Sequence, residues 1–161
     1  MLWLIRLWLP SSPWRLADLM AKVYEYKHIV GFEETNLVGN VYYANFILWQ
    51  GRTREMFLYE HAPDVIEQIS MGLALVTVNV SCQYLSELFA FDQVIIAMQL
   101  KEMVQNRITM GFEYWRTTQT DKTLVAIGEQ QAACMRREDG KNVPTSIPRS
   151  LQQALETYRI S

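Results

Sequence analysis

The residues best suited to chemistry lie in a short polar loop and in the apolar stretch that follows it, within positions 33–58. The loop holds Asn36, Gly39 and Asn40, residue types that tolerate tight turns and left-handed backbone. The first N–H groups of a helix that starts just after this loop have no partner inside the helix. The loop therefore predicts a site for a carbonyl oxygen or an anion, with the Tyr43 N–H as a candidate donor. In the simpler interpretation Asn36 only forms a turn and Tyr43 only packs.

Two arginines and one threonine are further candidates. Arg52 and Arg54 interrupt the apolar stretch and, two residues apart, point to different sides of a helix. One of them can be solvated or ion-paired while the other points at a ligand. Thr77 lies on the polar face of a predicted strand, with Asn79, Ser81 and Gln83, and the other face of that strand is apolar. This position also fits an outward residue without a role.

The usual catalytic and metal-binding motifs are missing. The sequence has no GxSxG, HExxH, paired CxxC, Walker or GxGxxG pattern. The two histidines, His28 and His61, have no metal-ligand spacing, so we expect structural or exposed positions for both. We expect neither a metal nor a cofactor.

Length and composition indicate a single globular domain. The 161 residues are 50% hydrophobic and 20% charged, enough for a sizeable core, and the net charge of −2 gives no basic surface for nucleic acid. Cys82 and Cys134 lie in apolar, strand-like runs, which predicts buried free thiols in a reducing compartment and hence a cytoplasmic protein. A disulfide between them is the alternative.

The first residues differ from the rest. MLWLIRLWLP is apolar but too short to span a membrane, and it lacks the charged start and the clear cleavage site of a signal peptide. Because Met20 followed by Ala21 and Lys22 resembles a natural start, we expect residues 1–21 to be a poorly ordered leader and residues 22–161 to be the domain.

The remaining pattern predicts one long helix among strands. The predicted helix starts near Tyr42 and ends before Pro63, and a short helical turn capped by Asp64 follows. Strands are expected at 22–30, 73–84, 91–104, 107–118 and 123–137, with a bulge at Gly128, a proline-containing linker after position 140 and a terminal helix at 149–159. This order predicts an α+β fold in which a long, curled antiparallel sheet wraps around one central helix.

The segment TNLVGNVYYANFILWQGRTR, residues 35–54, resembles the hot dog-fold acyl thioesterases of the 4-hydroxybenzoyl-CoA type. The pattern of that family is close to T-D-x-x-G-H-V-x-x-x-x-Y-x-x-W-x-E-x-x-R. Its catalytic Asp falls on Asn36 here, its His on Asn40 and its helical Glu on Gly51. An amide cannot act as a general base as a carboxylate does, so the sequence departs from the usual mechanism.

Within this family the sequence is most similar to the thioesterases of enediyne polyketide biosynthesis, a branch of antibiotic biosynthesis in which Asn replaces the Asp. The resemblance implies that Arg54 and Thr77 also belong to the site. It further implies hydrolysis of a β-ketoacyl polyene thioester on an acyl carrier protein, followed by loss of CO₂ to give a methyl ketone or polyene. In that reaction the Tyr43 N–H polarises the thioester carbonyl and Asn36 orients the carbonyl or a water. Arg54 holds the carboxylate product or the β-keto oxygen, and Thr77 hydrogen-bonds the substrate or that water.

The resemblance also implies a homotetramer, a dimer of dimers, with the site at a subunit interface. The expected partners are the acyl carrier protein domain of a polyketide synthase and its polyketide, with no nucleic acid and no membrane. Two alternatives stay open: a general acyl-CoA thioesterase of the same fold, and a non-catalytic hot dog protein that only binds an acyl chain.

Overall fold

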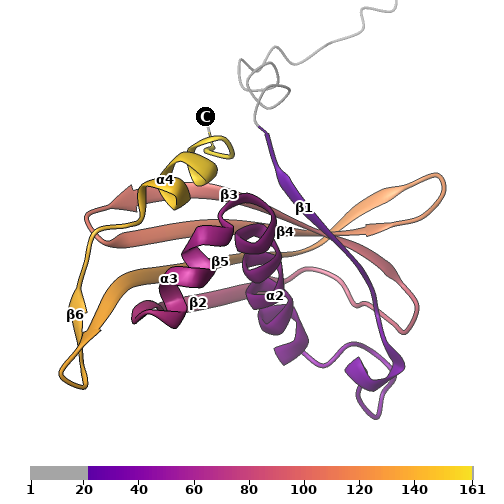
Figure 1. Ribbon diagram of the computed structural model, residues 1–161. Coiled ribbons are helices and arrows are strands. Elements are labelled where there is room, and N and C mark those ends of the chain that lie inside the picture. The colour runs from indigo at the N-terminus through magenta and orange to yellow at the C-terminus, as the bar shows by residue number, and fades with distance from the viewer. Residues whose placement is uncertain (1–21, 161) are drawn as a thin grey trace, which may run out of the picture.

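The computed structural model describes residues 22–160, so the predicted leader, residues 1–21, lies outside the described part of the chain. The strands are β1 (Tyr24–Ile29), β2 (Leu73–Tyr84), β3 (Gln93–Val104), β4 (Arg107–Thr117), β5 (Lys122–Glu138) and β6 (Lys141–Pro144). The helices are the 3₁₀ turn η1 (Phe32–Glu34), α2 (Ala44–His61), α3 (Pro63–Ser70) and α4 (Arg149–Glu156). Figure 1 shows the long helix α2 crossing the sheet, so the predicted α+β architecture is confirmed.

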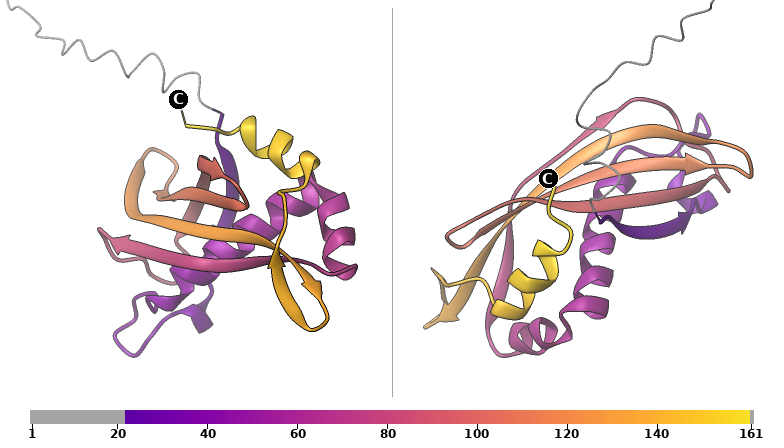
Figure 2. Two further views of the ribbon diagram at one scale, coloured as in Figure 1. Left: turned by 90° about the vertical axis from the view of Figure 1, so that its left-hand side faces the viewer. Right: turned by 90° about the horizontal axis from the view of Figure 1, so that it is seen from above.

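The sheet is antiparallel and runs in the order β1-β3-β4-β5-β2, with the short β6 paired to β5. Strands β1 and β2 lie on either side of α2 in the sequence, and they form the two edges of this order. The sheet curls, and α2, α3 and α4 all lie on one side of it (Figure 2). The edge strand β2 is twelve residues long and pairs with β5 on one side, while no strand within residues 22–160 pairs with its other side.

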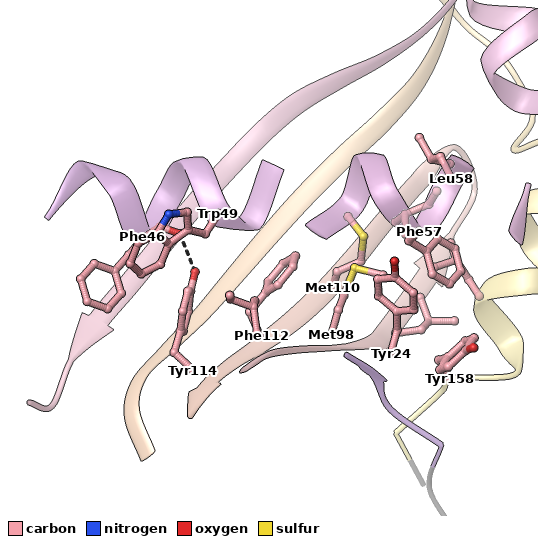
Figure 3. Packing of buried hydrophobic residues seen from close by; sticks show 14 of the residues in the cluster. Tyr24, Phe46, Trp49, Phe57, Leu58, Met98, Met110, Phe112, Tyr114 and Tyr158 are labelled. Carbon is pink, nitrogen blue, oxygen red and sulfur yellow. Dashed lines mark hydrogen bonds between the residues drawn. The ribbon is translucent and has the colours of Figure 1, made fainter. Parts of the chain in front are cut away.

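The core lies between α2 and the sheet (Figure 3). Phe46, Trp49 and Phe57 of α2 are buried there, at the helical spacing that the sequence predicts. The hydroxyl of Tyr114, on β4, donates to the Phe46 carbonyl of α2 at 2.7 Å. Tyr59 of the same helix is exposed, because the sheet of a single chain covers only one side of α2.

Pro63 separates the first two α-helices, as predicted. Proline lacks an N–H and fixes φ, so it ends one helix and fits the first position of the next. The predicted Asp64 cap is wrong, because α3 starts at Pro63 with Ala62 as its N-cap and Asp64 lies inside the first turn. Gly72 adopts φ +100° and turns the chain from α3 into β2.

The predicted bulge at Gly128 is also wrong. Gly128 pairs in register with Phe112 on β4 and with Cys82 on β2, and the bulge of β5 against β4 comes earlier, beside Tyr114. A different constraint explains the glycine: a Cβ at this position would overlap the side-chain nitrogen of Gln50. The expected linker after position 140 likewise begins with β6, which follows a turn at Asp139 and Gly140.

Candidate active site

Glu34 fixes the loop that leads into α2. One carboxylate oxygen accepts from the Gly31 N–H at 2.7 Å and from His28 Nε2 at 2.8 Å, and the other accepts from Trp49 Nε1 at 2.7 Å. Burial raises the pKa of Glu34, but these hydrogen bonds outweigh it, and the pKa lies below its usual value. Glu34 thus ties β1, the loop and α2 together, which gives His28 a structural role.

Asn36 lies in the tight turn of this loop. Its Oδ1 accepts from the Val38 N–H at 2.9 Å, and its backbone bonds to Asn40 and Gly39, each at 2.9 Å. Gly39 supplies the positive φ of +90° that the turn needs. The turn therefore uses the side-chain oxygen of Asn36, while its exposed Nδ2 has no acceptor among residues 22–160 and stays available as a donor.

Tyr43 is the N-cap residue of α2. No carbonyl within the described part of the chain accepts from its backbone N–H, as expected for a helix start. Tyr43 lines a cavity of about 160 Å³ together with Asn40, Phe46, Tyr84 and Glu87. The Tyr84 hydroxyl donates to the Tyr43 carbonyl at 3.1 Å and so fixes the helix end from the edge strand. The free N–H at the positive end of the helix can polarise a carbonyl.

A carboxylate that the sequence analysis did not assign belongs to the same cavity. Glu87 lies on the loop between β2 and β3, and its Oε1 accepts from Asn40 Nδ2 at 2.7 Å. Asn40 occupies the position of the family His, and its own Oδ1 is buried with no partner in the part of the chain that the structure describes. No sequence motif links these two residues, which lie 47 positions apart.

Arg54 points into the interior, whereas Arg52 is exposed and lies 3.6 Å from Glu55, so the prediction that the two differ is confirmed. The Arg54 Nη1 donates to the Gln130 Oε1 at 3.1 Å, while its Nε is buried and has no partner among the described residues. No carboxylate of residues 22–160 lies within ion-pair distance of its guanidinium. Burial lowers the pKa of Arg54, and Glu55 only partly offsets this. Arg54 is thus a cation held by a neutral amide.

Thr77 lies on the helix side of β2, and the reason is a bulge. The register with β5 shifts between Thr77, opposite Ala132, and Asn79, opposite Gln131. Because directly paired residues point to the same face, Thr77 shares the face of Ala132, which lines a small apolar cavity of about 10 Å³ with Arg54. The predicted grouping of Thr77 with Asn79 on one face is therefore wrong.

The four predicted site residues form two groups within one chain. Asn36 and Tyr43 belong to the loop and the start of α2. Arg54 of α2 lines a cavity with Ala132, the residue that pairs with Thr77 at the bulge of β2. Arg54 lies eleven positions after Tyr43 along the helix, a rise of about 16 Å. We call these groups the loop half-site and the arginine half-site. A larger cavity of about 380 Å³ beside β1 and β3 contains none of the four residues.

Other candidate chemistry is absent from the described residues. His61 packs among aromatic rings, with its Nε2 3.3 Å from the Tyr158 hydroxyl. Cys82 and Cys134 are free, as predicted, but only Cys134 is buried and Cys82 is half-buried. Loss of solvent around each thiol raises its pKa to about 11, which disfavours the nucleophilic thiolate. Among residues 22–160 no cluster of His, Cys, Asp or Glu could hold a metal, and no helix there is long and apolar enough to span a membrane.

Comparisons with known proteins agree with the predicted resemblance. The sequence profile of the Thioesterase-like superfamily matches residues 30–155. The dynemicin thioesterase, whose crystal structures describe induced fit and allosteric effects upon polyene binding, is 44% identical, with a TM-score of 0.84 over 87% of this chain and 99% of that chain.

More distant relatives share the fold. A protein of Aquifex aeolicus (strain VF5) named "Putative esterase" is 28% identical over 131 residues, which are 81% of this chain and 96% of the relative. A variant of 4-hydroxybenzoyl-CoA thioesterase, solved with 4-hydroxybenzoyl-CoA, is 15% identical and superposes with a TM-score of 0.73 over 84% of this chain and 99% of that chain. The superposition with the 4-hydroxybenzoyl-CoA thioesterase variant shows that the two chains share their fold.

Proposed function

The chain belongs to the thioesterase-like superfamily and has its hot dog fold, and from this premise we propose that it releases a β-ketoacyl polyene from the acyl carrier protein of an enediyne polyketide synthase. Thioester hydrolysis is the activity of the superfamily. The carrier-bound polyene and the later loss of CO₂ are the proposed refinements.

The reaction has two steps. Water adds to the thioester carbonyl, the carbon–sulfur bond breaks, and the sulfur leaves with a proton as the free thiol of the carrier. The other product is a β-keto acid. Its carboxyl proton moves to the β-oxygen while the bond to the carboxyl carbon breaks, which releases CO₂ and leaves an enol that tautomerises to a methyl ketone.

The loop half-site is suited to the first step. The free Tyr43 N–H, at the start of a helix, stabilises negative charge that develops on the thioester oxygen. The Asn36 Nδ2 supplies a second donor to that oxygen or to the attacking water. Glu87, held by Asn40, is the carboxylate that lines the same cavity, and we assign it as the general base for the water.

The arginine half-site is suited to the β-keto end of the acyl chain. Arg54 carries a charge that no carboxylate of residues 22–160 neutralises, so it can hold the β-oxygen or the released carboxylate. Thr77 lies on the same inner face and adds a hydroxyl. Because these residues lie about 16 Å along the helix from Tyr43, we propose that each site combines the loop half-site of one chain with the arginine half-site of its partner.

The exposed edge strand supports this assembly. β2 is twelve residues long and largely exposed, with Val76, Val78 and Val80 each more than a third exposed. An apolar edge of this length is a template for pairing with a second chain. A two-fold dimer along β2 would give two equivalent sites, and a dimer of such dimers is the proposed tetramer.

The observation that carries the proposal is the 44% identity to the dynemicin thioesterase, joined with an amide at Asn36 and an uncompensated Arg54 in this chain. The site has an amide where the family has its catalytic Asp, and it has a cation, Arg54, that can bind the β-keto oxygen of the proposed substrate.

The test is co-expression with an enediyne-type polyketide synthase, followed by mass spectrometry of the released compounds. We expect a methyl ketone or polyene that accumulates with the unmodified chain and falls strongly with Arg54→Ala. Hydrolysis of simple acyl-CoA esters as fast as the carrier-bound chain would instead identify a general acyl-CoA thioesterase. No hydrolysis above background would leave only a binding protein.

A further inference from the structure

Two buried polar atoms on one face of α2 lack hydrogen-bond partners. Gln50 is fully buried; its Nε2 donates to the Ser81 carbonyl at 2.9 Å, but its Oε1 accepts from nothing within the described residues. One helical turn later, the Arg54 Nε is buried and donates to nothing there. Buried polar atoms are rarely left unpaired, and each costs about 1–3 kcal/mol, so this pair calls for a ligand.

The two atoms are complementary, since one is an acceptor and the other a donor. Residues four apart on a helix are neighbours on the same face, so Gln50 and Arg54 lie on one face of α2. A single oxygen between the two side chains can hydrogen-bond to both atoms. That oxygen must accept from the guanidinium and donate to the amide, so it belongs to a hydroxyl, an enol or a water.

Two residues of β5, Gly128 and Gln130, contact Gln50 and Arg54 and fix their side chains. Gly128 of β5 lies under Gln50, where any Cβ would overlap the amide nitrogen. Gln130, two residues along the same face of β5, is 5% exposed and holds the Arg54 Nη1. An acidic side chain at Gln130 would neutralise the guanidinium; the neutral amide orients it and leaves its charge in place.

We propose that Gln50 and Arg54 together bind the β-oxygen of the acyl chain as an enol or a hydroxyl, and that Gln130 is a positioning residue for Arg54. This inference rests on the proposed function, because it names the substrate group that the arginine half-site recognises. Gln50 becomes a specificity-determining residue, since a chain without a β-oxygen leaves both buried atoms unpaired.

The experiment compares thioesters of one chain length, namely 3-oxooctanoyl, 3-hydroxyoctanoyl and octanoyl esters of the same carrier. We expect kcat/KM for the enolisable 3-oxo ester to exceed that for the octanoyl ester about tenfold or more. Gln50→Met keeps the length of the side chain but removes its polar atoms. It should abolish this preference, so that kcat/KM for the 3-oxo ester falls about tenfold or more, to the level of the octanoyl ester. The 3-hydroxy ester distinguishes an enol from a hydroxyl as the bound group. It should be preferred over the octanoyl ester only if a simple hydroxyl is sufficient for binding.

Thr53→Val is the matched control. Thr53 is a buried polar residue of the same helix, but its hydroxyl donates to the Trp49 carbonyl within that helix, so the ester preference should not change. Gln130→Met provides a second variant, should Gln50→Met fail to fold, and it should reduce the same preference.

The outcomes are distinct. Equal loss on all three esters in Gln50→Met, or no preference in the unmodified chain, would mean that the pair binds only a structural water and would overturn the inference while thioesterase activity stands. An unmodified chain that hydrolyses none of the esters would overturn the proposed function and the inference with it.

Discussion

If the loop half-site and the arginine half-site come from different chains, mixing two inactive variants should restore a predictable share of the activity. Asn36→Ala disables the loop half-site and Arg54→Ala disables the arginine half-site, and each variant alone should lose about 10²–10³ in kcat, the usual effect of removing one donor to a developing charge. If every site combines halves from two chains, a dimer of one chain of each kind has one intact site and one doubly altered site. An equal mixture with free exchange contains about half such dimers. The mixture should therefore regain about a quarter of the unmodified activity.

The assay is thioester hydrolysis after the two purified variants are mixed, with native mass spectrometry of chains of different mass to measure exchange. The matched control is a mixture of Arg54→Ala with Thr77→Ala. Both substitutions affect the arginine half-site, so no dimer of these chains has an intact site and no activity should return.

Two results would refute the reasoning. The first is an Asn36→Ala and Arg54→Ala mixture that stays inactive although mixed dimers form, since the residues would then not act across a shared interface. The second is full turnover by Asn36→Ala alone, which would remove Asn36 from the site altogether.

Further substitutions test individual contacts. Glu34→Gln removes a carboxylate that accepts three hydrogen bonds, so urea unfolding at neutral pH should show a loss of about 2 kcal/mol. The pKa of Glu34 is lowered in the folded chain, so this stabilisation is present above the unfolded-state pKa and is lost as pH falls through the folded-state pKa. The difference in unfolding free energy between the unmodified chain and Glu34→Gln should therefore shrink on acidification. Gly128→Ala should lower Tm because its Cβ overlaps Gln50, whereas Gly51→Ala, with open space at its Cβ in the middle of α2, should stabilise by up to about 1 kcal/mol. Glu87→Gln should lower kcat about 10²-fold or more in the hydrolysis assay without lowering Tm, and unchanged turnover would exclude the general base.

Local patterns in the sequence were sufficient to predict the α-helices and strands β1 to β5, but not η1 or β6. β2 occupies residues 73–84, as predicted, because a long run of alternating β-branched residues ends at turn-forming ones. α2 ends before Pro63 because proline cannot continue a helix. The loop with Asn36 and the start of α2 were likewise readable, since turn chemistry and helix N-termini depend on residues close together in the chain.

The face on which Thr77 lies depended on the register between two strands. Simple alternation placed Thr77 with Asn79, but the bulge between them reverses the alternation and turns Thr77 toward the helix. The same kind of long-range contact explains why the sequence did not identify Gln50 and Gln130, which in isolation resemble ordinary polar positions of a helix and a strand.

By itself, then, the sequence determined the α-helices, every strand except β6, and the loop that carries Asn36, because these depend on interactions among neighbours. Only the tertiary structure decided that Glu87 lies beside Asn40, that Gln130 holds Arg54, and that the arginine and loop half-sites are separate within one chain. Those arrangements depend on strand pairing and on the packing of α2 over the sheet, which bring together residues up to 76 positions apart and leave no local signal.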